Sequence, residues 1–186
     1  MIMGKGRGVR IAILAEDLLL ERFARRVLTE LGYERRELRF VADGRGKGSA
    51  KQWIDQQYPV QVKTYRKEKN HQSVGLLVAT DADEQTIQER SGALGKALQQ
   101  ASLQVRAGDE RIAHWIPRRS IETWGIALTG GNADEETPYK KTPQTRDIDW
   151  KRAASAFVED YHRPPPQRMA SLPSLMAAYR ETNRLK

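Results

Sequence analysis

The stretch VRIAILAED at residues 9–17 and the stretch VGLLVATDADE at residues 74–84 decide the fold of this 186-residue chain. Each begins with a near-continuous apolar run, which is typical of a strand buried on both faces of a parallel sheet. Each run then ends in carboxylates, at the point where open α/β sheets bind their ligands. If the two strands are neighbours, Glu16, Asp81 and Asp83 meet at one edge of the sheet and would hold a divalent cation.

Strand and helix patterns alternate from residue 9 to residue 128, which predicts βαβ units and an α/β fold with a mostly parallel, Rossmann-like sheet flanked by helices. The expected strands are 9–15, 37–41, 74–80 and 111–116. The expected helices are 17–31, 49–57, 83 or 84 to 101, and 120–128, with 59–72 as an extended stretch or a loop.

The chain divides into three parts in this interpretation. Residues 9–130 form the α/β domain, and residues 131–148 form a loop or linker. Residues 149–186 form a small helical C-terminal appendage, with helices at 149–161 and 171–183 separated by a polyproline segment. We expect this appendage to pack on one side of the domain.

The composition limits which metal sites and partners the chain can have. The chain has no cysteine, which excludes disulfides and thiolate metal sites, and its three histidines lie far apart, which argues against zinc. Oxygen-ligated Mg²⁺ or Mn²⁺ remains the expected cofactor. The net charge of +8 indicates an anionic partner, for which nucleic acid (DNA or RNA) fits better than a membrane surface. The sequence predicts no membrane span and no secretory signal, so we expect a cytoplasmic protein.

The acidic residues have two interpretations. Asp81 and Asp83 are two positions apart, so they point the same way if strand geometry continues, and their oxygens suit a hard cation. Glu16 would hold metal or take a proton from an attacking water. Alternatively, Asp81 or Asp83 only caps the helix that follows, as we expect Asp17 to do for the first helix.

This pattern resembles the Toprim domain of topoisomerases, primases, recombination proteins and overcoming-lysogenisation-defect nucleases. Glu16 matches the glutamate after that family's first strand, and DADE at residues 81–84 matches its Asp-x-Asp. The resemblance covers about residues 9–128, and it differs at Asp17, where the family often has glycine. The segment SIETW at residues 120–124 is also similar to a helix of small operon-encoded Toprim-like proteins. This implies a further metal ligand in Glu122, for which a surface acid is the alternative.

The resemblance implies a metal-dependent, phosphodiester-processing nuclease with Glu16, Asp81 and Asp83 as catalytic residues, in phage defence or mobile-element biology. A second hypothesis is a non-catalytic subunit of a multi-protein defence complex, partnered with an ATPase or another operon-encoded subunit. A third is a phosphoryl-accepting receiver domain, which also gathers acids at strand ends.

Basic residues in or near loops are the candidate phosphate contacts. The glycine-rich loop at residues 42–48 lacks the order of a Walker loop, so it predicts either contact with a nucleic-acid phosphate or a solvated loop rather than a nucleotide site. The candidate nucleic-acid-binding residues are Arg45, Lys47, Lys67, Lys69, Arg118 and Arg119. His114 is expected to be structural, and the tryptophans Trp53, Trp115 and Trp124 to lie in the core.

Overall fold

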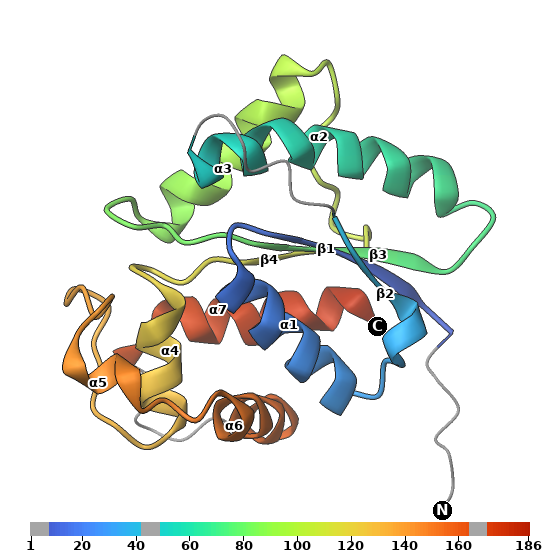
Figure 1. Ribbon diagram of the computed structural model, residues 1–186. Coiled ribbons are helices and arrows are strands. Elements are labelled where there is room, and N and C mark those ends of the chain that lie inside the picture. The colour runs from blue at the N-terminus through green and yellow to red at the C-terminus, as the bar shows by residue number, and fades with distance from the viewer. Residues whose placement is uncertain (1–7, 42–48, 164–170) are drawn as a thin grey trace, which may run out of the picture.

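Four parallel strands form a single sheet in the order β2-β1-β3-β4. The computed structural model describes residues 8–41, 49–163 and 171–186 (Figure 1). The strands are β1 (Arg10–Ala15), β2 (Leu38–Phe40), β3 (Val74–Ala79) and β4 (Ile112–Trp115). The predicted α/β class with a parallel, Rossmann-like sheet is therefore confirmed.

The two apolar stretches lie side by side, as predicted. β1 and β3 pair in register along their whole length, from Arg10 opposite Val74 to Ala15 opposite Ala79. Every residue of β3 is buried, which explains why its sequence is apolar throughout rather than alternating. The backbone N–H of Glu16 donates to the carbonyl of Ala79 at 2.9 Å, so the pairing extends one residue beyond β1. The acidic segments that follow the two strands therefore leave the sheet at the same edge.

Helices cover both faces of the sheet (Figure 1). They are α1 (Leu18–Glu30), α2 (Ala50–Glu68), α3 (Ile87–Gln100), α4 (Ile121–Leu128), α5 (Pro143–Arg146), α6 (Trp150–His162) and α7 (Pro173–Thr182), with 3-10 turns η1 (Arg35–Glu37) and η3 (Asn183–Leu185). α2 and α3 pack on one face, and α1, α4, α6 and α7 lie on the other, which gives two hydrophobic clusters separated by the sheet. None of the helices within the described ranges combines the length and apolarity needed to cross a membrane.

The helix α2 is longer than predicted. We expected it to end near residue 57, with 59–72 extended or in a loop, but it continues to Glu68 through Pro59. A proline inside a helix removes one backbone hydrogen bond. Tyr58, Val62 and Tyr65 lie buried against the sheet one helical turn apart, and this burial outweighs the cost of the proline. The prediction of an extended stretch or a loop over residues 59–72 is therefore wrong up to Glu68.

Smaller differences concern where helices begin. α3 starts at Ile87 rather than at residue 83 or 84, because Thr86 forms a capping box with Glu89. The predicted Asp17 cap of α1 is confirmed by a hydrogen bond of 2.8 Å from the N–H of Leu20. The last helix starts at Pro173 rather than at residue 171, since proline fits the first helical position. Most of the polyproline segment lies outside the described residues.

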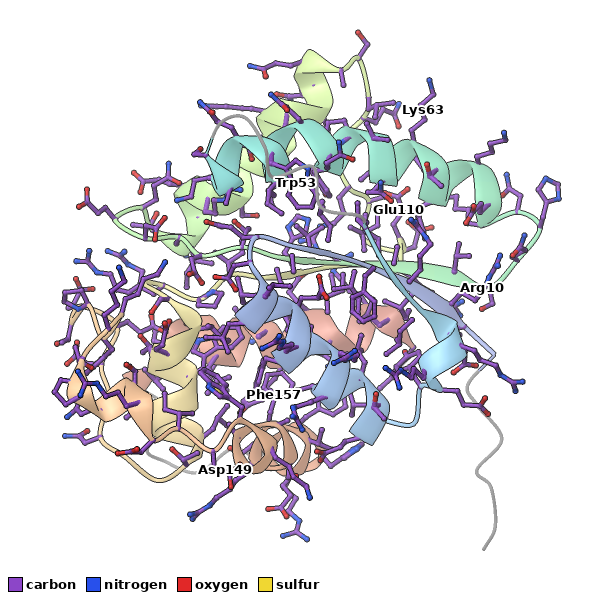
Figure 2. All side chains as sticks on the ribbon, in the orientation of Figure 1. Arg10, Trp53, Lys63, Glu110, Asp149 and Phe157 are labelled. Atoms are coloured by element: carbon purple, nitrogen blue, oxygen red, sulfur yellow. The ribbon has the colours of Figure 1, made fainter. Side chains whose placement is uncertain are left out.

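The C-terminal helices share the core of the sheet. Phe157 of α6 points from its helix toward the sheet (Figure 2). It contacts Phe23 of α1 and Trp115 of β4, with ring centroids 5.9 and 5.1 Å apart. The indole of Trp115 donates to Thr182 of α7 at 3.0 Å. At the very end of the chain, the carbonyl of Leu185 accepts from the hydroxyl of Tyr33 at 2.7 Å. The helices of residues 149–186 thus cover one face of the sheet.

Candidate functional site

The topology places a crevice at the carboxyl ends of β1 and β3. From β1 the chain passes through α1 to β2 on one side, and from β2 it passes through α2 to β3 on the other. The strand order therefore reverses between β1 and β3. Such a switch point is the usual ligand site of open α/β sheets, since the loops on its two sides separate there. Glu16 follows β1 and Asp81 follows β3, so both lie at this point.

Glu16 and Asp81 are brought together, as the sequence predicted. The carboxylate of Glu16 accepts from the hydroxyl of Thr80 at 2.5 Å and from the backbone N–H of Asp81 at 3.1 Å. Asp81 is 2% exposed, and its Oδ1 has no hydrogen-bond partner among the described residues. Burial, and then the charge of Glu16, raise the pKa of Asp81 well above its ordinary value. Binding of a proton or of a cation would therefore stabilise this pair of acids.

A buried arginine stands behind this pair. Arg90 is 1% exposed, and its Nε donates to the hydroxyl oxygen of Thr80 at 3.1 Å, while its Nη1 pairs with Asp55 at 2.7 Å. Because the oxygen of Thr80 accepts from Arg90, the single hydroxyl proton is directed to Glu16. Arg90 and Thr80 thereby fix the orientation of the Glu16 carboxylate. The buried guanidinium also offsets part of the negative charge of the two acids.

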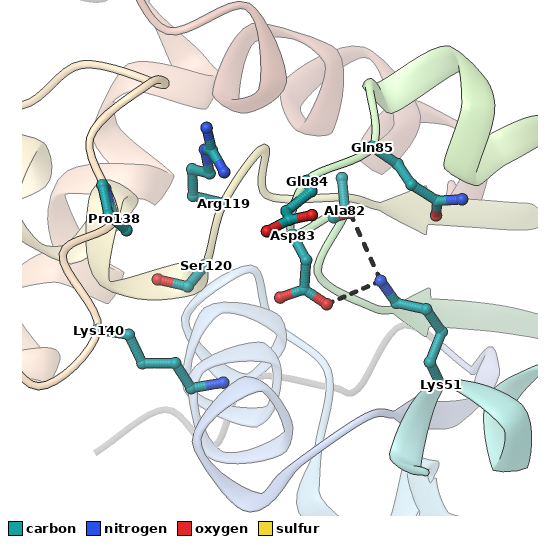
Figure 3. Close-up of a pocket in the computed structure, with 9 residues that line it drawn as sticks. All are labelled: Lys51, Ala82, Asp83, Glu84, Gln85, Arg119, Ser120, Pro138 and Lys140. Carbon is teal, nitrogen blue, oxygen red and sulfur yellow. Dashed lines mark hydrogen bonds and ion pairs between the residues drawn. The ribbon is translucent and has the colours of Figure 1, made fainter.

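Asp83 pairs with a lysine instead of joining the other two acids (Figure 3). Its backbone has a φ of 54°, and its carboxylate pairs with the ammonium of Lys51 at 2.7 Å. The N–H of Ala82 donates to the carbonyl of Pro117, and Arg118 donates to the carbonyl of Asp83. These bonds bend the segment after β3, so the expectation that Asp81 and Asp83 point the same way is wrong. The capping alternative is also wrong for both, since Thr86 caps α3.

A cavity of about 500 Å³ opens beside Asp83. Its lining residues are Lys51, Ala82, Asp83, Glu84, Gln85, Arg119, Ser120, Pro138 and Lys140 (Figure 3). Lys140 extends into it from the side opposite to Lys51. Burial alone would lower the pKa of Lys140, but the carboxylates of Asp81, Glu122 and Asp83 together raise it above its ordinary value. The crevice therefore has basic side chains on the sides of a group of acidic ones.

The remaining predicted residues fall into three groups. Arg118 and Arg119 lie at the crevice, and both approach Glu136 at 3.9 Å. Lys67 and Lys69 lie at the other end of α2, about 24–27 Å along the helix from Lys51 at 1.5 Å per residue, so they do not join the crevice. The candidates Arg45 and Lys47 lie outside the described residues.

The donor set suits a hard cation, although it is smaller than predicted. In the described ranges, no three side chains of histidine, aspartate or glutamate lie close enough together to form a ready metal site. Glu16 and Asp81 are the two acidic residues at the switch point: the carboxylate of Glu16 accepts from the backbone N–H of Asp81, and the Oδ1 of Asp81 has no partner among the described residues. Mg²⁺ commonly takes only one or two carboxylates, together with water and substrate phosphate oxygens. Asp83 would join only after leaving Lys51, and Glu122 acts on the charge of Lys140 but does not line the cavity.

Sequence analysis did not assign four residues to the acidic site that the structure places there: Lys51, Thr80, Arg90 and Lys140. Thr80 carries a signal, because a polar residue directly before an acidic pair ends an otherwise apolar strand. Arg90 carries a weaker one, since it falls on the apolar side of a helix. Lys51 and Lys140 are far from the acids in the sequence and are brought to the site by the fold. Their local sequence contains no pattern that predicts this position.

No protein-family model matches the chain, and comparisons with curated proteins and with solved structures give no match either. The functional conclusion therefore rests on the geometry of the crevice.

Proposed function

We propose that this chain is a Toprim-like nuclease that cleaves phosphodiester bonds of DNA or RNA with Mg²⁺ or Mn²⁺. The observation that carries the proposal is the buried carboxylate of Asp81, whose Oδ1 has no partner in the described structure, in a residue whose backbone N–H donates to Glu16. A buried carboxylate without a partner is costly to keep. Its position at the switch point of a parallel sheet supports a role in ligand binding rather than in stability.

The residues of the crevice have separate roles in this proposal. Glu16 and Asp81 would hold the cation, which when bound supplies Lewis-acid stabilisation of the phosphate and lowers the pKa of a bound water. Glu16 is the residue placed to accept a proton, since Thr80 and Arg90 hold its carboxylate in one orientation. Lys140 and Arg119 line the cavity and would bind the non-bridging phosphate oxygens.

Cleavage by the purified full chain tests the proposal. Labelled DNA and RNA are incubated with Mn²⁺, with wild type, with Asp81→Asn and with Glu16→Gln. We expect cleavage by wild type and a loss of about 10³-fold in each variant, because electrostatic stabilisation of the transition state accounts for that order of rate. Glu110→Gln is the matched control, since Glu110 is buried like Asp81 but precedes β4 at the opposite edge of the sheet.

One observation favours a second function. Lys51 occupies the carboxylate of Asp83, so only two acids are ready to hold metal in the described chain. A non-catalytic subunit of a defence complex, partnered with an ATPase, would retain the fold and the basic crevice without cleaving. Nucleic-acid binding by wild type with no cleavage in Mn²⁺, and no difference in Asp81→Asn, would support this function and reject the nuclease.

A further inference from the structure

A second hollow lies on the α1 side of the sheet, between α1, η1 and the first turn of α6. Its volume is about 360 Å³. We call it the basic groove, and its lining residues are Arg25, Arg26, Thr29, Glu30, Arg35 and Lys151. Five of these residues come from α1 and the η1 turn that follows it, and the fold brings Lys151 of α6 beside them. None of them was among the candidates predicted from sequence.

The basic groove carries an excess of positive charge. Four of its lining residues are cationic and one, Glu30, is acidic. Glu30 already accepts from the hydroxyl of Ser155 at 3.1 Å. Among the described residues, Arg26, Arg35 and Lys151 take part in no ion pair, and all three are exposed. The groove thus has an excess of three positive charges over its single acid, and cations that repel one another are stabilised when an anion binds between them.

The start of α6 adds an independent observation. Asp149 caps this helix by accepting from the N–H groups of Lys151 and Arg152, both at 3.0 Å. The first turn of α6 contains no acidic residue, and these two cations stand in it. A cation at a helix N-terminus is unfavourable by about 0.3–1 kcal/mol because of the helix dipole. Both side chains are exposed, so packing gives no reason for this arrangement. An anionic ligand outside the helix would give one.

We propose that the basic groove binds the phosphodiester backbone of a nucleic acid, beyond the segment that enters the crevice. The identity of this ligand as substrate rests on the proposed nuclease function. α1 begins at the crevice with Asp17, and Arg26 lies nine residues further on, about 14 Å along the helix at 1.5 Å per residue. That distance corresponds to about four phosphates of one strand at 3.4 Å each. A strand held in the crevice can therefore reach the groove along α1.

Binding without cleavage tests the groove. The affinity of the full chain for a labelled DNA duplex and for a labelled RNA duplex is measured by fluorescence anisotropy in EDTA, at several salt concentrations. The groove variant combines Arg26→Ala, Arg35→Ala and Lys151→Ala. The control variant combines Lys63→Ala, Lys96→Ala and Arg180→Ala, which removes the same charge from exposed positions on α2, α3 and α7. Thermal melting checks that both variants fold.

We expect the groove variant to bind at least one duplex about tenfold more weakly, and its plot of log affinity against log salt to be shallower by about 2–3. The control variant should stay within about twofold of wild type. Equal losses in both variants, or no duplex binding by wild type, overturn the proposal. Unchanged binding by the groove variant also overturns it and points to an acidic protein surface instead. Because EDTA prevents metal-dependent cleavage, failure of the nuclease function appears separately, as binding without cleavage in Mn²⁺.

Discussion

Two carboxylates at opposite edges of the same sheet have opposite environments. Glu110 precedes β4 at the amino edge, and its carboxylate accepts from Arg66 at 2.8 and 2.9 Å and from the N–H of Ala107 at 2.9 Å. Asp81 follows β3 at the carboxyl edge, and its Oδ1 accepts from no described residue. Both residues are buried, at 4% and 2% exposure.

The pKa values of the two acids shift in opposite directions. The hydrogen bonds from Arg66 lower the pKa of Glu110, whereas burial raises the pKa of Asp81. At the amino edge, the charged form of Glu110 is stabilised by its hydrogen bonds. At the carboxyl edge, the charged form of Asp81 is disfavoured, because its Oδ1 has no hydrogen-bond partner in the described structure. Proteins keep such unsatisfied groups where a ligand is to bind. The comparison therefore separates an acid whose hydrogen bonds stabilise the fold from a buried acid that we propose binds a ligand.

The largest change in stability is expected when the ion pair at the amino edge is broken. Arg66→Met removes the partner of Glu110 and should lower the free energy of unfolding by about 2–3 kcal/mol at neutral pH. Because the folded pKa of Glu110 is lowered, its stabilisation is present above its unfolded pKa and is lost as the pH falls. The difference between wild type and variant, measured by urea unfolding, should therefore shrink in acid. Arg180→Met on the exposed side of α7 is the control and should change stability by less than about 0.5 kcal/mol.

Asp81→Asn should act in the opposite direction. It removes a buried ionisable group and should raise the free energy of unfolding in EDTA by about 1–2 kcal/mol at neutral pH. For a chain of this size, each kcal/mol raises the melting temperature by about 2–4 °C. The folded pKa of Asp81 is raised, so its contribution to stability is present below its unfolded pKa and is lost as the pH rises. The gain in the variant should thus grow with pH. A destabilised variant at neutral pH would mean that the carboxylate is satisfied after all.

The support behind the crevice has a smaller effect. Thr80→Val removes the hydroxyl that joins Arg90 to Glu16 and should weaken Mn²⁺ binding about tenfold in a calorimetric titration, as is usual for residues that orient metal ligands. Thr80→Ser retains the hydroxyl and should bind Mn²⁺ as wild type does. Equal affinities for all three proteins would show that Glu16 needs no such support.

The smallest effect concerns Lys51. Its pair with Asp83 is partly exposed, at 26% and 48% for the two side chains, so it contributes only about 0.5–1 kcal/mol. Lys51→Ala removes a competing ammonium and should tighten Mn²⁺ binding about two- to fivefold. Weaker binding in this variant would mean that Lys51 positions Asp83 rather than competing with the cation.

The fold and half of the acidic site follow from the sequence for identifiable reasons. β1 and β3 are fully apolar runs that end in acids, and parallel strands place such ends at one edge, which is why Glu16 and Asp81 were paired correctly. The orientation of Asp83 depends on its own left-handed backbone, on the bond that the N–H of Ala82 donates to the carbonyl of Pro117, and on the bond that Arg118 donates to the carbonyl of Asp83. No local sequence pattern encodes these contacts. α2 was cut short because the burial of Tyr65 against the sheet is a tertiary effect.

The hydrogen bond from Tyr33 to the carbonyl of Leu185 has a consequence for how the molecule is made. During synthesis, at about 5–20 residues per second, β1 to β4 leave the ribosome well before α7 and η3. Until α7 and η3 emerge, the apolar face that holds Phe23 and Trp115 lacks part of its cover. During that interval we expect the exposed apolar face to be open to aggregation and to chaperone binding.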